Sequence, residues 1–176
     1  MLKGHDYLLV DGYNVSQQWI NAGFLQPGEL DYERQQLITV LSSVASYWDI
    51  QCLLVFDAHL VKGNPGSTEQ MTPHLCVIFT PENQTADSLI ERLSVSLAAD
   101  NKHVLVCTSD LAEQNIVLTR GASRISSREF LLEVKRAKQE INDVYGRHPA
   151  TTQRSWLEDS LPSDIKQALD DMRKKK

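Results

Sequence analysis

The chain has 176 residues, of which 41% are hydrophobic and 23% charged, and its formal net charge is −5. This length suits one domain with a full core and a short appendage. No apolar run approaches the roughly 18 to 20 residues that cross a bilayer, and the stretch before the first apolar run has no signal-peptide character. We therefore expect a cytoplasmic protein with no membrane association.

Short apolar runs alternate with amphipathic stretches along the chain, a pattern that predicts an α/β fold with a parallel sheet. We expect strands over about 6–11, 51–57, 75–79, 103–108 and 122–125, and helices over about 32–48, 85–99, 110–117 and 126–145. The last helix begins with a capping box, in which Ser126 accepts from the first turn and Glu129 reaches back. The cysteines, which lie within strand-like runs without metal-ligand spacing, are expected to be reduced core residues.

Three segments fall outside this regular pattern. The residues between the first strand and the helix at 32 are expected to form a loop, with Gly12 allowing a sharp turn. Residues 58–74 have no helical stripe and contain Gly, Pro, Asn and Ser, which predicts a long mobile loop. Residues 149–176 are expected to form a linker, a short helix and a basic tail, leaving residues 1–148 as the main domain.

Acidic residues follow the apolar runs. Asp11, Asp57 and Asp110 each end such a run, and Asp87 begins a helix just after another. The carboxyl ends of neighbouring parallel strands meet at one edge of a sheet, where ligands bind. Carboxylates gathered there repel one another unless a cation neutralises them, which predicts a divalent metal site. Two alternatives remain open: Asp11 as a strand-end cap, and Asp87 as a partner of the helix dipole.

The chemistry of the predicted site follows from its oxygen ligands. Hard carboxylate oxygens favour Mg²⁺ or Mn²⁺, and zinc is not expected because no Cys/His ligand spacing is present. The chain also has no P-loop, dinucleotide-binding or nucleophile-elbow motif. Glu91 and Glu113 are candidate supporting residues, and Asp57 is the least certain ligand because it could instead orient His59 or Lys62.

Charge is distributed unevenly along the chain. Residues 1–119 carry a balance of −9, whereas residues 120–176 carry +4. This distribution would suit a nuclease, in which the acidic half binds the metal ion and the basic half binds the phosphates of the nucleic acid. Arg124 and Arg128 belong to the clearest cationic cluster, and arginine forks suit phosphate oxygens. The alternative is that the basic residues of the last helix form salt bridges with acids of the same helix.

Five ordered sequence blocks resemble the YacP-like branch of the NYN-domain proteins, within the PIN-like nuclease superfamily. The blocks are LVDGYN (9–14), VFDAHLVKG (55–63), IFTPENQTAD (78–87), TSD followed by EQ (108–114) and GASRISSREF (121–130). They extend over about residues 6–145 in the expected order. The resemblance implies a PIN-like three-layer α/β/α sandwich with a central, mostly parallel sheet.

The resemblance also implies metal-dependent cleavage of RNA, with Asp11, Asp87 and Asp110 as the acidic core. Members of this branch are similar to endoribonucleases that cut mRNA in association with the translating ribosome. On this basis we expect Asn14 to position substrate or water. His59, Lys62, Arg124 and Arg128 are expected to contact RNA or the ribosome. The alternative is a non-catalytic RNA- or ribosome-binding module on the same fold. A metal-dependent phosphatase or DNA nuclease is a third possibility.

Overall fold

The computed structural model describes residue 2 and residues 4–58, 62–108 and 122–145. The chain divides into two compact units, residues 1–139 and residues 140–176. The division expected at residue 148 stays a prediction. None of the helices in the described ranges combines the length and the apolar character that crossing a bilayer demands.

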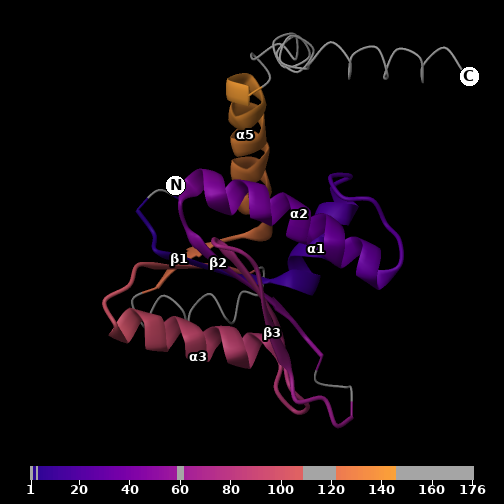
Figure 1. Cartoon of the computed structure of the whole chain (residues 1–176), viewed down its shortest axis with the longest axis vertical. Coiled ribbons are helices and arrows are strands. Elements are labelled where there is room, and N and C mark those ends of the chain that lie inside the picture. Colours follow the sequence, from indigo (N-terminus) through magenta and orange to yellow (C-terminus); the bar gives the residue numbers. More distant parts are fainter. Residues whose placement is uncertain (1, 3, 59–61, 109–121, 146–176) are drawn as a thin grey trace, which may run out of the picture. The chain divides into compact units, whose positions relative to one another are not determined.

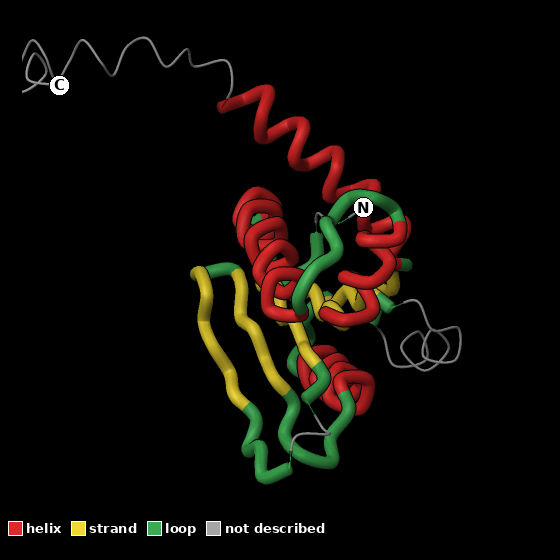
Figure 2. Tube along the Cα trace, turned by 90° about the vertical axis from the view of Figure 1, so that its right-hand side faces the viewer, coloured by secondary structure: helices red, strands yellow, loops and turns green. Residues whose placement is uncertain are grey.

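A six-stranded sheet forms the centre of the first unit (Figure 1), with strand order β3-β4-β2-β1-β5-β6. The strands are β1 (Tyr7–Asp11), β2 (Gln51–Phe56), β3 (Ser67–Thr72), β4 (Leu75–Phe79), β5 (Val104–Cys107) and β6 (Ser123–Ile125). All neighbouring pairs are parallel except β3 and β4, which form an antiparallel hairpin at one edge of the sheet (Figure 2). This arrangement confirms the predicted fold class, an α/β sandwich with a mostly parallel sheet.

Helices cover both faces of the sheet (Figure 1). The helices are α1 (Gly12–Asn21), α2 (Leu30–Trp48), α3 (Ala86–Ala99) and α5 (Ser127–Tyr145). Helix α3 packs on one face, where Leu89 and Ile90 join Leu9, Val55 and Val106 of the strands in one buried cluster. Helices α1 and α2 lie on the opposite face with the start of α5, whose Phe130 ring packs against both Trp19 and Trp48.

Most predicted elements are confirmed to within two residues, but two predicted loops contain regular structure. Helix α1 begins directly after β1, because Asp11 serves as its N-cap and accepts from the Asn14 backbone N–H at 3.1 Å. Strand β3 lies inside the segment expected to be a mobile loop. All but the last of its residues are exposed, so the strand has no apolar alternation and is held by the backbone ladder to β4. The predicted helix over 110–117 lies outside the described residues.

Gly12 has a different role from the one expected. It is the first residue of α1, and a side chain there would meet the buried ring of Phe56 on β2, with a Cβ only 2.5 Å from Cδ1. The residue is therefore needed for close approach of α1 to the sheet, not for a sharp turn. This approach holds the N-terminus of α1 against the carboxyl edge of the sheet.

Gly12→Ala is expected to destabilise the protein by about 1 to 3 kcal/mol, the usual cost of inserting a group into a packed core. Urea unfolding followed by circular dichroism measures this loss. In a Phe56→Leu background the same substitution should cost less, because the ring that it strikes is gone. Equal losses in both backgrounds would mean that the contact with Phe56 is not the cause.

Candidate active site

Strand register places two of the predicted acids on the same face of the sheet. Side chains alternate between the faces along a strand. Leu9 and Val55 both pack towards α3, so Asp11 and Asp57, each two residues further on, point towards that face. Asp11 stands opposite Val55 in the ladder between β1 and β2. Asp11 ends β1 and Asp57 directly follows β2, so the two carboxylates lie at the carboxyl ends of adjacent strands.

Asp87 completes this acidic group from the first turn of α3, whose N-cap is Thr85. Burial raises the pKa of Asp11, and the negative charges of Asp87 and Asp57 raise it further. Hydrogen bonds from the backbone N–H groups of Asn14 and Tyr13 act in the opposite direction and lower this pKa. The ionised form of Asp11 is thus disfavoured by its surroundings, which a cation at this edge would reverse.

Asp57 is connected to β4 through the buried hydroxyl of Thr80. That hydroxyl donates to Asp57 Oδ1 at 3.4 Å and accepts from the Ala58 backbone N–H at 2.8 Å. The end of β2 is therefore joined to the end of β4 immediately beside the acidic group. This contact suits the supporting role expected for Asp57.

Asn14 is held in a fixed orientation by two donors. Its Oδ1 accepts from Gln18 Nε2 at 3.1 Å and from the Ser127 hydroxyl at 3.4 Å. Ser127 is the first residue of α5, and its carbonyl also accepts from the Trp19 indole N–H at 3.1 Å. Helices α1 and α5 are thereby joined next to Asp11. With its oxygen bound from two sides, Asn14 can offer its Nδ2 hydrogens to a ligand.

An arginine lies among aromatic rings on the other face of the same edge. The Arg34 guanidinium stands 5.3 Å from the Tyr13 and Phe79 ring centroids and 5.7 Å from that of Phe56. It also donates to the Tyr13 hydroxyl and forms an ion pair with Asp31 at 2.7 Å. These contacts hold α2 against α1 and the sheet.

The predicted cationic residues differ in their surroundings. Lys62 and Arg128 are exposed, and Arg124 is partly buried on β6. Among the residues that the structure describes, the buried Nε of Arg124 finds no hydrogen-bond partner. Its positive charge lies near Glu129, whose pKa is lowered chiefly by hydrogen bonds from Ser126 and also by Arg124. The capping box predicted for Ser126 and Glu129 is confirmed.

The complete metal ligand set cannot be assembled from the described part of the chain. Within it, no three His, Cys, Asp or Glu side chains form a group that could hold a metal ion. Asp110, Glu113 and His59 lie outside the described residues, so their roles stay predictions. Asp11 and Asp87 nevertheless fit a hard cation in chemistry, since they offer oxygen ligands and their mutual repulsion would be relieved by positive charge.

Comparison with known proteins identifies the family. The family model described as the YacP-like NYN domain matches residues 8–174. The chain belongs to the YacP-like NYN domain family. The match extends beyond residue 148, so it includes much of the C-terminal segment outside the five sequence blocks.

Relatives of this family agree with the fold. The chain is 38% identical over 149 residues to the uncharacterized protein YacP of Bacillus subtilis, a match that covers 82% of this chain and 86% of the relative. The crystal structure of Rae1 (YacP) from Bacillus subtilis matches with a TM-score of 0.67 and 34% identity, over 97% of this chain and 95% of that one. The crystal structure of a tryptophan-to-leucine mutant of Rae1 gives the same TM-score of 0.67 at 31% identity, over 95% of this chain and 99% of that one. The predicted family and fold are confirmed, and the family is of a PIN-like nuclease type.

Three residues around the site were missed from the sequence alone. Gln18 and Ser127 orient Asn14, and Arg34 fills the aromatic cluster. The spacing of Asn14 and Gln18, four residues apart, is a helical signal that becomes visible once Asp11 is identified as an N-cap. The contacts of Ser127 and Arg34 join distant parts of the chain, and no local pattern indicates them.

Asp11→Asn is expected to raise the thermal midpoint at about pH 7 in a chelator, because the amide still accepts from Asn14 and no longer repels the neighbouring acids. The pKa of Asp11 is raised above its ordinary value of 3.8, so the native state binds this proton more tightly than the unfolded chain does. Asp11 therefore lowers stability at pH values above its folded-state pKa. This penalty disappears as the pH falls through that value towards 3.8.

Thermal melts of wild type and variant between about pH 7 and about pH 4 check this expectation. The increase in thermal midpoint caused by Asp11→Asn should be largest at neutral pH and should become smaller in acid. Asp49→Asn is the matched control, since Asp49 is exposed at the far end of α2. A lower midpoint for Asp11→Asn at neutral pH would show that the ionised carboxylate stabilises the fold.

Proposed function

We propose that the protein is a metal-dependent endoribonuclease that hydrolyses phosphodiester bonds of mRNA in association with the translating ribosome. The observation that carries the proposal is the partly buried Asp11, whose pKa is raised by burial and by the charges of Asp87 and Asp57. A carboxylate with a perturbed pKa among other acids at the carboxyl edge of a parallel sheet is typical of a catalytic site. The nuclease type of the family supports the same function.

The acidic group supplies the ligands in this proposal. Asp11 and Asp87, together with Asp110, would hold Mg²⁺ or Mn²⁺ through carboxylate oxygens. When bound, the ion supplies an activated water and stabilises the leaving oxygen. Asp57 is kept as a supporting residue, because Thr80 already donates to it, and Glu91 and Glu113 are further supporting candidates.

Asn14 is proposed to orient the substrate. Gln18 and Ser127 hold its Oδ1, so its Nδ2 group can donate to a phosphate oxygen or to the attacking water. A donor fixed in advance needs no reorganisation during the reaction, which is the condition for effective electrostatic stabilisation. Rotation of the amide would require both hydrogen bonds to Oδ1 to be broken.

Cationic residues around the edge are proposed to contact RNA or the ribosome. Lys62 and Arg128 are exposed, and Arg124 is partly buried on β6; His59 completes the proposed set. The net charge of −5 is unusual for a protein that binds free RNA tightly. Delivery of mRNA by the ribosome would lower the affinity that the protein itself must supply, which supports the ribosome as partner.

Asp11→Asn and Asp87→Asn are each expected to keep the fold and to lower cleavage by roughly a thousandfold, about 4 kcal/mol of barrier. The measurement is mapping of new 5′ ends after incubation of the purified protein with translating ribosomes and, separately, with naked mRNA. Asp49→Asn, which removes an exposed charge far from the edge, should cleave like wild type. EDTA should abolish cleavage, and Mg²⁺ or Mn²⁺ should restore it.

Each other outcome has a definite meaning. Wild-type rates for both Asp variants with metal present would refute the proposed mechanism. Binding to ribosomes without cleavage by wild type would identify a non-catalytic module. Equal cleavage of matched DNA would change the substrate class to nucleic acid in general.

A further inference from the structure

A seam between α5 and the segment from α1 to α2 contains two pockets. The first, of about 370 Å³, is lined by residues of α1 and by Ser127, Arg128 and Leu131 of α5. The second, of about 400 Å³, is lined by Phe24, residues of α2 and Lys138 of α5. Arg128, Leu131 and Lys138 follow one another at helical spacing on one side of α5. The pockets therefore succeed each other along this helix.

The first pocket starts next to the candidate active site. Gln18 and Ser127 line it, and both donate to Asn14 Oδ1. The Asn14 backbone N–H in turn donates to Asp11. The first pocket is therefore connected to Asp11 through Asn14, so the seam begins close to the acidic edge.

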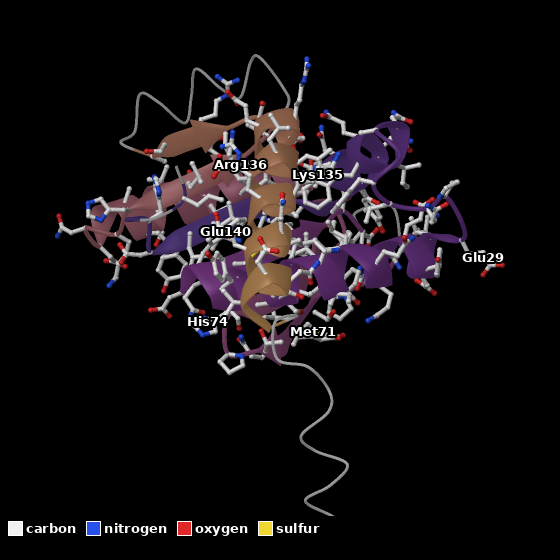
Figure 3. The ribbon with its side chains drawn as sticks, turned by 90° about the horizontal axis from the view of Figure 1, so that it is seen from above. Glu29, Met71, His74, Lys135, Arg136 and Glu140 are labelled. Carbon is white, nitrogen blue, oxygen red and sulfur yellow. The ribbon has the colours of Figure 1, made fainter. Side chains whose placement is uncertain are left out.

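The side of the seam that α5 forms carries positively charged lysine side chains. The Lys135 and Lys138 ammonium groups lie 5.6 Å and 5.3 Å from the centroid of the Phe24 ring. This ring lines the second pocket and packs edge-on against Trp19, which lines the first. In the part of the chain that the structure describes, neither lysine has a carboxylate partner. Glu133 instead pairs with Arg136 at 2.8 Å, and Figure 3 shows Lys135 and Arg136 on different sides of α5. The lysines are thus held in place by an aromatic ring while their charge stays available.

The lining of the second pocket includes an exposed aromatic ring, that of Tyr32, together with Lys138. Tyr32 is 52% exposed, and its Cδ1 lies where it leaves no room for a side chain on Gly28. One part of the ring thus packs on backbone while the rest faces solvent. Gln35 and Thr39 also line this pocket and offer polar groups.

We propose that this seam binds the single-stranded RNA segment that flanks the cleaved bond. The inference rests on the proposed ribonuclease function and assigns a path to its substrate. Lysines with available charge suit phosphates, and an exposed tyrosine suits stacking with a base, a combination that recurs in single-strand binding sites. From Arg128 to Lys138 the helix rises about 15 Å, enough for a few nucleotides. The cationic lining favours RNA over a peptide segment, because a peptide lacks the regularly spaced negative charges of a phosphate backbone.

Binding is tested in the full chain carrying Asp11→Asn, so that the readout does not depend on cleavage. The probe is a fluorescein-labelled single-stranded RNA of about 12 nucleotides, and anisotropy is measured between about 50 and about 200 mM salt. Lys135→Ala and Lys138→Ala, made separately, should each weaken binding and each reduce the slope of log K against log salt by about 0.7. Tyr32→Ala should weaken binding about tenfold, and Tyr32→Phe should preserve it.

Arg136→Ala is the matched control, because it removes one positive charge from the same helix on a different side. Its effect on the slope should be smaller than that of either lysine. Equal effects of all three substitutions, or no binding by the parent protein, would overturn the inference. Unchanged RNA binding with reduced co-sedimentation on ribosomes would also overturn it and assign the seam to a protein or ribosomal surface. If the lysines prove irrelevant while Asp11 remains essential for cleavage, the seam inference fails and the ribonuclease function stands.

Discussion

Repulsion among carboxylates at the end of β1 is the constraint that the rest of the site depends on. Asp11 is partly enclosed, faces the charges of Asp57 and Asp87, and caps α1 through its bond from Asn14. An uncharged hydrogen-bond acceptor at position 11 would cap α1 without this repulsion and would give a more stable fold. The sheet register and the start of α3 instead direct the acids to the same place, which is the local conflict expected at a functional site.

Two close contacts keep this arrangement rigid. The Phe56 ring lies directly against Gly12, so the first turn of α1 cannot move outward without opening a void in the sheet layer. Ser127 then connects the start of α5 to α1 through both Asn14 and Trp19. The acids and Asn14 thus belong to elements that are locked by packing, although they come from distant parts of the sequence. Such preorganisation allows a few side chains to act together.

Much of this fold was predictable because its core elements have strong periodicity. The apolar runs before Asp11 and Asp57 and the stripe of α3 correspond to buried strands and a helix. The α1 helix was missed because its apolar signal is short and its polar residues resemble a loop. Strand β3 was missed because its residues are mostly exposed, so no alternation appears in the sequence.

The candidate site likewise contains residues that the sequence predicts and residues that it does not predict. The positions of Asp11, Asp57 and Asp87 follow from strand ends and one helix cap, features that a sequence displays. The choice of Gln18, Ser127 and Arg34 as neighbours depends on how α1, α2 and α5 pack, which is a tertiary property. The family resemblance indicates the order of the motifs, whereas the side on which Asp11 points comes from the register of the sheet.

Trp19 is an intrinsic fluorophore located where α1 meets α5. Its indole is almost fully enclosed, donates to the Ser127 carbonyl and touches the rings of Phe24 and Phe130. The wavelength of indole emission depends on the polarity and hydrogen bonding of the surroundings. Separation of α5 from α1 will therefore shift the emission maximum of Trp19. The junction beside the candidate active site can therefore be followed in solution without an attached dye.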